Sequence, residues 1–213
     1  SRWTKTGTLH AATYAVAMQA PSLPAPEEIA LLEPFERLGL DRIALVGTLG
    51  EAERAAEVLE RAAVWGFDTE SKPTFEAGVA SQGPHVVQFA MLEQAFVFQL
   101  HDPGCREVAA DLLERAGIVK AGFGLNDDKR RITHKLGVEP QDVLDLDTVF
   151  RERGYRRQMG IKAAVAVLFG RDDRHDRSDR RRYECRAAGR RIARRVCGSL
   201  GIGRAGRMPG AYH

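Results

Sequence analysis

The sequence predicts an α/β protein in which helices flank a mixed five-stranded sheet. Three apolar segments with strand character follow one another without an intervening helix, and a short turn around Glu93 and Gln94 joins the last two. Strands joined by a tight turn pair antiparallel, whereas strands separated by a helix tend to become parallel neighbours. Because the chain contains both kinds of connection, the sheet is expected to be mixed.

The first predicted strand covers residues 42–47, RIALVG. Thr48 and Glu51 then have the spacing of a capping box, in which each side chain bonds the backbone of the other residue. They precede the sequence EAERAAEVLERAA, residues 51–63, whose apolar side chains recur at helical spacing. The chain therefore begins its folded region with a strand followed by an amphipathic helix.

The remaining elements are predicted in the same way, from apolar periodicity and from the residues that end each segment. Gly137, for example, closes one of the predicted helices. The predicted strands cover residues 62–68, 85–90, 95–100 and 118–124, and the predicted helices cover residues 105–117, 126–137, 141–153 and 159–170.

Composition restricts the class of protein. With 213 residues, 44% of them hydrophobic and 29% charged, the chain is long enough for one globular domain with a substantial core. No apolar run reaches the roughly 18 residues that a membrane span needs. Three cysteines without a C-x-x-C pair argue against a disulfide framework or a zinc site, and they fit a cytoplasmic protein. We expect no signal peptide, and Met18 resembles a start residue behind a leader.

Charge and composition divide the chain into three regions. Residues 1–40 are rich in proline and polar groups and are interpreted as an N-terminal extension that packs on the domain formed by residues 41–170. Residues 171–213 hold 13 Arg, no Lys and five acids, a net charge of +8, so the other 170 residues carry −5. Such a basic segment can bind phosphate backbones without reading their sequence.

Two acidic groups follow predicted strands. Asp68 and Glu70 end the second strand at positions i and i+2, so both side chains can point to the same side. Two carboxylates there repel each other unless a cation lies between them, and Mg²⁺ accepts carboxylate oxygens readily. Asp127 and Asp128 open a helix, where the helix dipole favours a negative charge. Taken alone, the first group is also typical of a strand end exposed to solvent, and the second of an ordinary charged helix start.

Together these segments resemble the 3′–5′ exonuclease domain of the DEDD superfamily, of the ribonuclease D and Werner-helicase type. The resemblance runs in order from about Arg42 to Gly170 and is carried by the following segments: VWGFDTE, PHVVQFA, AFVFQL, VKAGFGLNDDKRRI, VLDLDTVF and GIKAAVAVLFG. It implies a ribonuclease-H-like fold, a mixed five-stranded sheet with helices. It also implies the family's first motif on Asp68 and Glu70 and its second on Asp128, with Asp127 as the neighbour.

The resemblance implies an enzyme that removes nucleotides from the 3′ end of single-stranded RNA or DNA. Two divalent ions, Mg²⁺ or Mn²⁺, would be held by carboxylates, activate a water molecule and stabilise the leaving oxygen. Substrate contacts are expected near this centre. For His85 an ordinary edge-strand role stays open, and for Phe123 core packing is the alternative. The expected contacts are Thr69, His85, Gln88, Phe123 and Asn126.

The sequence departs from the family at the third motif, which should supply a fourth carboxylate in a Tyr-x-x-x-Asp or His-x-x-x-x-Asp run after residue 170. No such run is present, so the carboxylate is missing or comes from Asp172, Asp173, Asp176, Asp179 or Glu184. The Arg-rich tail is interpreted either as the product of a frameshift just after Gly170 or as a true basic arm. The alternative function is therefore a catalytically impaired exonuclease-fold protein that binds nucleic acid.

Overall fold

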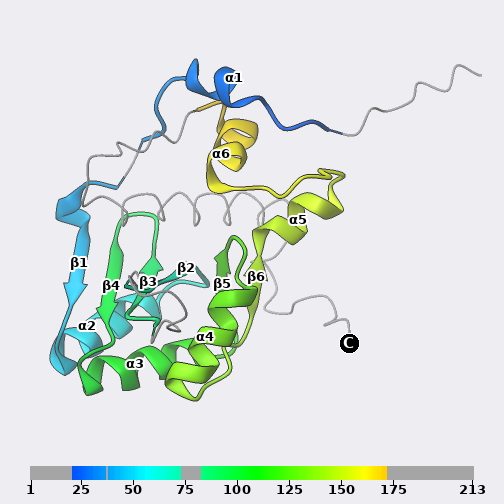
Figure 1. Ribbon diagram of the computed structural model, residues 1–213. Helices are drawn as coiled ribbons and strands as arrows, with labels where there is room; N and C mark the ends of the chain where they lie inside the picture. Colours follow the sequence, from blue (N-terminus) through cyan, green and yellow to red (C-terminus); the bar gives the residue numbers. More distant parts are fainter. Residues whose placement is uncertain (1–20, 37, 73–82, 172–213) are drawn as a thin grey trace, which may run out of the picture.

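The computed structural model describes residues 21–36, 38–72 and 83–171 of the chain (Figure 1). A six-stranded sheet forms its centre, with the order β1-β4-β3-β2-β5-β6. The strands are β1 Ile43–Val46, β2 Val64–Glu70, β3 Val86–Ala90, β4 Ala95–Gln99, β5 Val119–Gly122 and β6 Val143–Asp145.

The sheet is mixed, as predicted. β2 pairs antiparallel with β3, and β3 pairs antiparallel with β4, whereas β1 with β4, β2 with β5 and β5 with β6 are parallel pairs. Among the strands of the described region, β3 alone therefore runs opposite to the others. The carboxyl ends of the other five strands lie along one edge of the sheet.

Helices cover both faces of the sheet. They are α1 Pro26–Ala30, α2 Leu49–Leu59, α3 Pro103–Glu114, α4 Asn126–Leu136, α5 Leu146–Glu152 and α6 Ile161–Phe169, with a short 3₁₀ helix at Leu40–Arg42. Side chains of α2, α3 and α4 share one buried cluster with Trp65, Phe89 and Phe98 of the sheet. Side chains of α5 and α6 pack in a second cluster with β5. In Figure 1, α1 lies beside α6, away from α2, α3 and α4.

Local sequence signals explain where several helices begin and end. At the start of α2, Glu51 N–H donates to Thr48 Oγ1 at 3.4 Å, and Glu51 Oε2 accepts from Thr48 N–H at 3.1 Å. This is the predicted capping box. At the carboxyl ends of two helices, Gly137 follows α4 with a φ of 74° and Gly170 follows α6 with a φ of 61°. Glycine adopts this left-handed conformation without the penalty that a Cβ imposes.

One predicted element is wrong. Residues 141–153 were expected to form a single helix, but they form the strand β6 followed by the shorter helix α5. Asp142 has a φ of 51°, which a continuing right-handed helix does not allow. The backbone of Asp142 instead accepts Lys120 N–H at 2.9 Å, and its side chain accepts Gly117 N–H at 2.6 Å. The sheet therefore has six strands, and the predicted α/β class with a mixed sheet flanked by helices is otherwise confirmed.

None of the helices in the described ranges combines the length and the hydrophobicity that a bilayer span requires.

Candidate active site

The candidate site lies at the carboxyl end of β2, in the middle of the sheet. From β2 the chain continues to β3 and β4 on one side, and it later returns through α3 to β5 on the other side. In open α/β sheets, ligands bind outside the carboxyl ends of strands at the point where the strand order reverses. The junction of β2 and β5 is such a point, and Asp68 and Glu70 stand at its rim.

The side chains at the end of β2 alternate between the two faces of the sheet. Asp68 and Glu70 share one face, and Gln88, which is directly opposite Asp68 on β3, shares that face with them. Asp68 Oδ1 accepts Thr69 N–H at 2.6 Å, which orients its carboxylate. Gln88 is 4% exposed, and its Nε2 has no hydrogen-bond partner in the described part of the chain. A buried amide donor therefore lies beside the two carboxylates.

The two neighbouring acids of α4 have different surroundings. Asp128 is half-buried, and one of its carboxylate oxygens accepts a short hydrogen bond from the hydroxyl of Thr69. Asp127 is exposed and pairs with Arg130 on the surface of its own helix. The hydrogen bond from Arg130 is the main reason why the pKa of Asp127 lies below its ordinary value, ahead of the Arg130 charge itself. Asp128 is thus tied to the end of β2 through Thr69, whereas Asp127 is not.

Two features position the start of α4 near the end of β2. Gly122 ends β5 so close to β2 that a Cβ would lie 2.5 Å from the carbonyl oxygen of Phe67. Asp145, at the end of β6, then accepts the N–H groups of Gly124 and Leu125 at 3.1 Å each. The same carboxylate also accepts Asp147 N–H at 3.0 Å, where it caps α5. Asp145 therefore fixes the loop that sets the direction in which α4 begins.

The predicted substrate contacts His85 and Phe123 have different surroundings. His85 directly precedes β3 and lies next to the end of β2: its N–H donates to the Glu70 carbonyl oxygen at 2.8 Å, and its Nδ1 accepts Lys72 N–H at 3.0 Å. Phe123 instead stacks on Phe150 with ring centroids 6.4 Å apart and belongs to the second buried cluster. Phe123 therefore packs in the core, which was the alternative to a substrate contact.

Asn126 is exposed at the first position of α4. It lines a polar pocket of about 520 Å³ together with Asp145, Asp147 and Arg156. Asp147 is itself occupied, because it pairs with Arg151 and accepts Met159 N–H at 2.6 Å. This pocket is therefore built mainly from groups that already hold the α5 region together.

The described residues contain no group of three or more His, Cys, Asp or Glu side chains arranged to hold a metal ion. The donor chemistry of Asp68, Glu70 and Asp128 nevertheless fits a hard divalent ion, because all their ligand atoms are carboxylate oxygens. In the present arrangement the three acids do not form a complete metal centre, and Asp128 accepts a hydrogen bond from Thr69. The candidates for a fourth carboxylate, in residues 172–184, lie outside the described residues.

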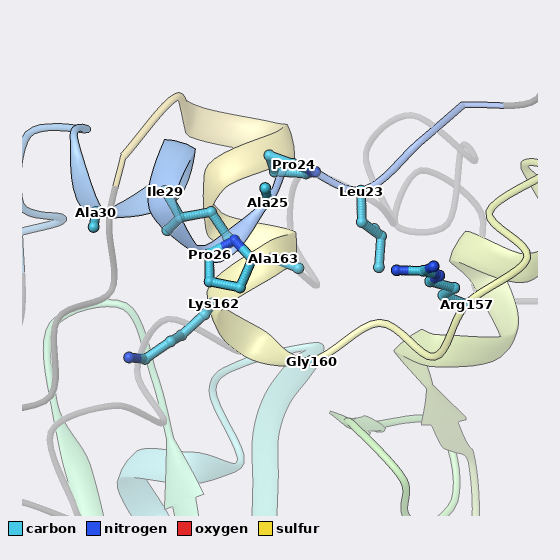
Figure 2. Close-up of a pocket in the computed structure, with 10 residues that line it drawn as sticks. All are labelled: Leu23, Pro24, Ala25, Pro26, Ile29, Ala30, Arg157, Gly160, Lys162 and Ala163. Atoms are coloured by element: carbon cyan, nitrogen blue, oxygen red, sulfur yellow. The ribbon is translucent and has the colours of Figure 1, made fainter.

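A further pocket, of about 570 Å³, lies between α1 and α6 (Figure 2). Its walls are mainly apolar, formed by residues such as Leu23, Ile29 and Ala163, and Arg157 and Lys162 also line it. Figure 2 shows Leu23 extending towards Arg157, while the Lys162 side chain extends away. None of the candidate carboxylates lines this pocket, so it is separate from the site at β2.

Sequence reasoning did not identify Asp145 as a residue that supports the site. The available signal was its position, because an Asp directly after a short strand and before a helix is a typical helix cap. Assigning residues 141–153 to a helix concealed that signal. The importance of Asp145 for the loop of Gly124 and Leu125 depends on the pairing of β6 with β5, which brings residues about 20 positions apart together.

Comparison with known proteins supports the same type of domain. No family model matches the chain. A 3′–5′ exonuclease of Arabidopsis thaliana is 27% identical over 105 residues, which cover 48% of this chain and 36% of that protein. The chain thus matches little more than a third of the plant protein.

Solved structures share the fold. The EXO domain of Aedes aegypti Nibbler has a TM-score of 0.59 at 16% identity, over 78% of this chain and 94% of that one. Escherichia coli RNase D, an exoribonuclease involved in structured RNA processing, also has 0.59 at 16% identity, over 75% and 44%. Trypanosoma brucei RNase D in complex with RNA U12 has 0.57 at 20% identity, over 76% and 62%. The ribonuclease-H-like fold that the resemblance implies is therefore confirmed.

Proposed function

We propose that this chain, which has the fold of DEDD-superfamily 3′–5′ exonuclease domains, hydrolyses phosphodiester bonds from the 3′ end of single-stranded RNA or DNA. The observation that carries the proposal is the placement of Asp68 and Glu70 at the central rim of the sheet, with Asp128 tied to the intervening Thr69. The similarity to the plant 3′–5′ exonuclease and to RNase D supports it.

Divalent metal ions, Mg²⁺ or Mn²⁺, are part of this proposal. Asp68, Glu70 and Asp128 would hold them, and the bound ions would supply an activated water and stabilise the leaving oxygen. The chain's own residues prepare the site: the backbone N–H of Thr69 orients Asp68, and its hydroxyl orients Asp128. The amide of Gln88, buried beside Asp68 with its Nε2 unbonded, offers a donor to a substrate oxygen.

A second candidate function is nucleic-acid binding without efficient hydrolysis. It is favoured by the lack of a three-ligand group among the described residues and by the lack of the third motif in the sequence. With one carboxylate fewer, the ions would be held less firmly, at a cost of several kcal/mol in transition-state stabilisation, by analogy with the loss of other charge-stabilising groups.

One assay separates the two functions. The full chain is incubated with single-stranded RNA or DNA of 12 nucleotides, labelled with fluorescein at the 5′ end, in the presence of Mg²⁺, Mn²⁺ or EDTA. The exonuclease predicts a ladder of products shortened from the 3′ end that EDTA and Asp68→Ala both abolish. Identical traces for the wild type and Asp68→Ala, with retained binding of the labelled strand, would leave the binding function.

A further inference from the structure

A third pocket, of about 610 Å³, lies at the same edge of the sheet as the candidate site. It is formed around the end of β4 and the start of β3, with side chains from α3 and α4. Five basic or imidazole side chains line it, and none of the described residues in its walls is acidic. These five are Lys72, His85, His101, Arg106 and Lys135.

The pocket shares a wall with the end of β2. His85 donates its N–H to the Glu70 carbonyl oxygen at 2.8 Å, and Lys72 donates its N–H to His85 Nδ1 at 3.0 Å. Lys72 follows Glu70 by two residues, so their Cα atoms are at most about 7 Å apart. A nucleic-acid strand whose end lies at Asp68 and Glu70 can therefore also reach this pocket.

Two of the lysines that line the pocket act electrostatically on His85. Burial lowers the pKa of His85 below its ordinary value, and the positive charges of Lys72 and Lys135 lower it further. Both lysines therefore act on the same small region. Arg106 enters from α3 with a planar guanidinium that can donate to two oxygens of a phosphate at once.

We propose that this pocket binds phosphate groups of a nucleic-acid strand whose 3′ end lies at Asp68 and Glu70. The inference rests on the proposed function and deepens it, because it assigns the path of the strand leading away from the site. A phosphodiester carries the negative charge and the acceptor oxygens that the lysines, Arg106 and a neutral imidazole N–H can satisfy. Strands long enough to reach the pocket should bind more tightly than a dinucleotide.

The test measures binding of the full chain to a 12-nucleotide uridine RNA, labelled at its 5′ end, by fluorescence anisotropy in EDTA at several salt concentrations. The variant Lys72→Gln/Lys135→Gln should weaken binding roughly tenfold or more at about 0.1 M salt. The slope of log affinity against log salt should fall by about 1.4, because each phosphate of a single strand that the protein no longer neutralises lowers it by about 0.7. Arg106→Gln should weaken binding in the same direction.

The matched control is Arg61→Gln/Lys162→Gln, which removes two exposed positive charges that do not line the pocket. The control should change neither the affinity nor the slope. An unchanged slope in Lys72→Gln/Lys135→Gln, or an equal loss in the control, would overturn the proposal. A thermal shift with inorganic phosphate that this variant abolishes, without any effect on RNA binding, would assign the pocket to free phosphate and also overturn it.

The outcomes distinguish this inference from the proposed function. Binding in EDTA does not depend on hydrolysis, so an inactive protein with a phosphate-binding pocket would still show the loss in affinity. Conversely, if the wild type shortens both the 12-nucleotide RNA and the dinucleotide UpU, and the Lys72→Gln/Lys135→Gln variant cleaves both at the wild-type rate, the exonuclease stands and the pocket assignment fails. Under the proposal, the variant loses activity on the 12-nucleotide RNA and keeps it on UpU.

Discussion

Two adjacent carboxylates at the start of α4 differ in what surrounds them, and this difference makes a prediction at the scale of single residues. Asp128 accepts a hydrogen bond from Thr69 at the end of β2, whereas Asp127 pairs with Arg130 on the surface. We expect Asp128→Asn to lower the rate of shortening of a 5′-labelled RNA in Mn²⁺ by about 100-fold or more, in line with the loss of one charge-stabilising group. Asp127→Asn serves as the control and should stay within about threefold. Equal effects of the two substitutions would contradict this assignment.

Lys120 is a charged residue that the protein buries completely on β5. Its ammonium group donates to the Arg115 carbonyl oxygen and lies 5.5 Å from the centre of the Trp65 ring. Burial lowers the pKa of Lys120 from 10.5 to about 8, which the nearby Asp142 charge only partly opposes. The unfolded chain therefore binds more protons than the folded one between about pH 8 and 10.5, and this group's contribution to stability rises with pH across that window.

Replacing Lys120 by methionine tests the free-energy cost of burying its ammonium group. At pH 7 the buried ammonium is charged, so Lys120→Met should raise the free energy of unfolding by roughly 1 to 3 kcal/mol. The advantage over the wild type should shrink as the pH rises from about 8 towards 10.5. Urea unfolding at pH 7 and pH 10 measures both effects, and Lys162→Met, at an exposed position of α6, is the control. A destabilised Lys120→Met at both pH values would show that the ammonium's hydrogen bond outweighs its desolvation.

At the scale of elements, the close approach of β2 and β5 depends on Gly122. A methyl group at Gly122 would lie 2.5 Å from the Phe67 carbonyl oxygen, which is backbone and cannot turn away. We expect Gly122→Ala to destabilise the protein by about 1 to 3 kcal/mol, the usual cost of overpacking. Thermal and urea unfolding measure this cost, and the exonuclease rate should fall as well, because α4 follows directly from this strand.

Gly50 provides a control with the opposite sign. It lies in α2, and the nearest atom to an added Cβ is Nη1 of Arg54, at 3.6 Å. Gly50→Ala should therefore stabilise the protein by up to about 1 kcal/mol, because alanine loses less backbone freedom in a helix. If both alanine variants changed stability in the same direction, the steric argument for Gly122 would be wrong.

The elements also show why one sequence prediction failed. The segment 141–153 contains enough apolar residues at helical spacing to suggest one helix, and its second half is indeed α5. Its first half becomes β6 because Val143 and Asp145 find partners on β5, at Lys120 and Gly122. A strand of three residues has too few positions to show a period of two, so its pairing partner rather than its own sequence decides its structure.

At the scale of the whole molecule, metal binding should couple to stability. An ion that binds only the folded protein stabilises it by about 2.7 kcal/mol when its concentration is 100 times its dissociation constant. We therefore expect Mn²⁺ to raise the melting temperature of the wild type in a concentration-dependent manner, and to raise that of Asp68→Ala much less. Ca²⁺ and Mg²⁺ series show whether the response is specific. A shift of equal size in the variant would place the ion elsewhere than at Asp68.

The sequence by itself determined the class of fold, the succession of all but one strand along the chain, the cap at Thr48 and the D-x-E pair at Asp68 and Glu70. These features depend on local periodicity, on capping chemistry and on residues adjacent in the chain, so they can be predicted from the sequence. Only the tertiary structure decided that Asp128 accepts a hydrogen bond from Thr69, that Asp145 holds the start of α4, and that basic residues from four distant segments form one pocket. Those relations arise from strand pairing and helix packing between residues far apart in sequence, about which local patterns carry no information.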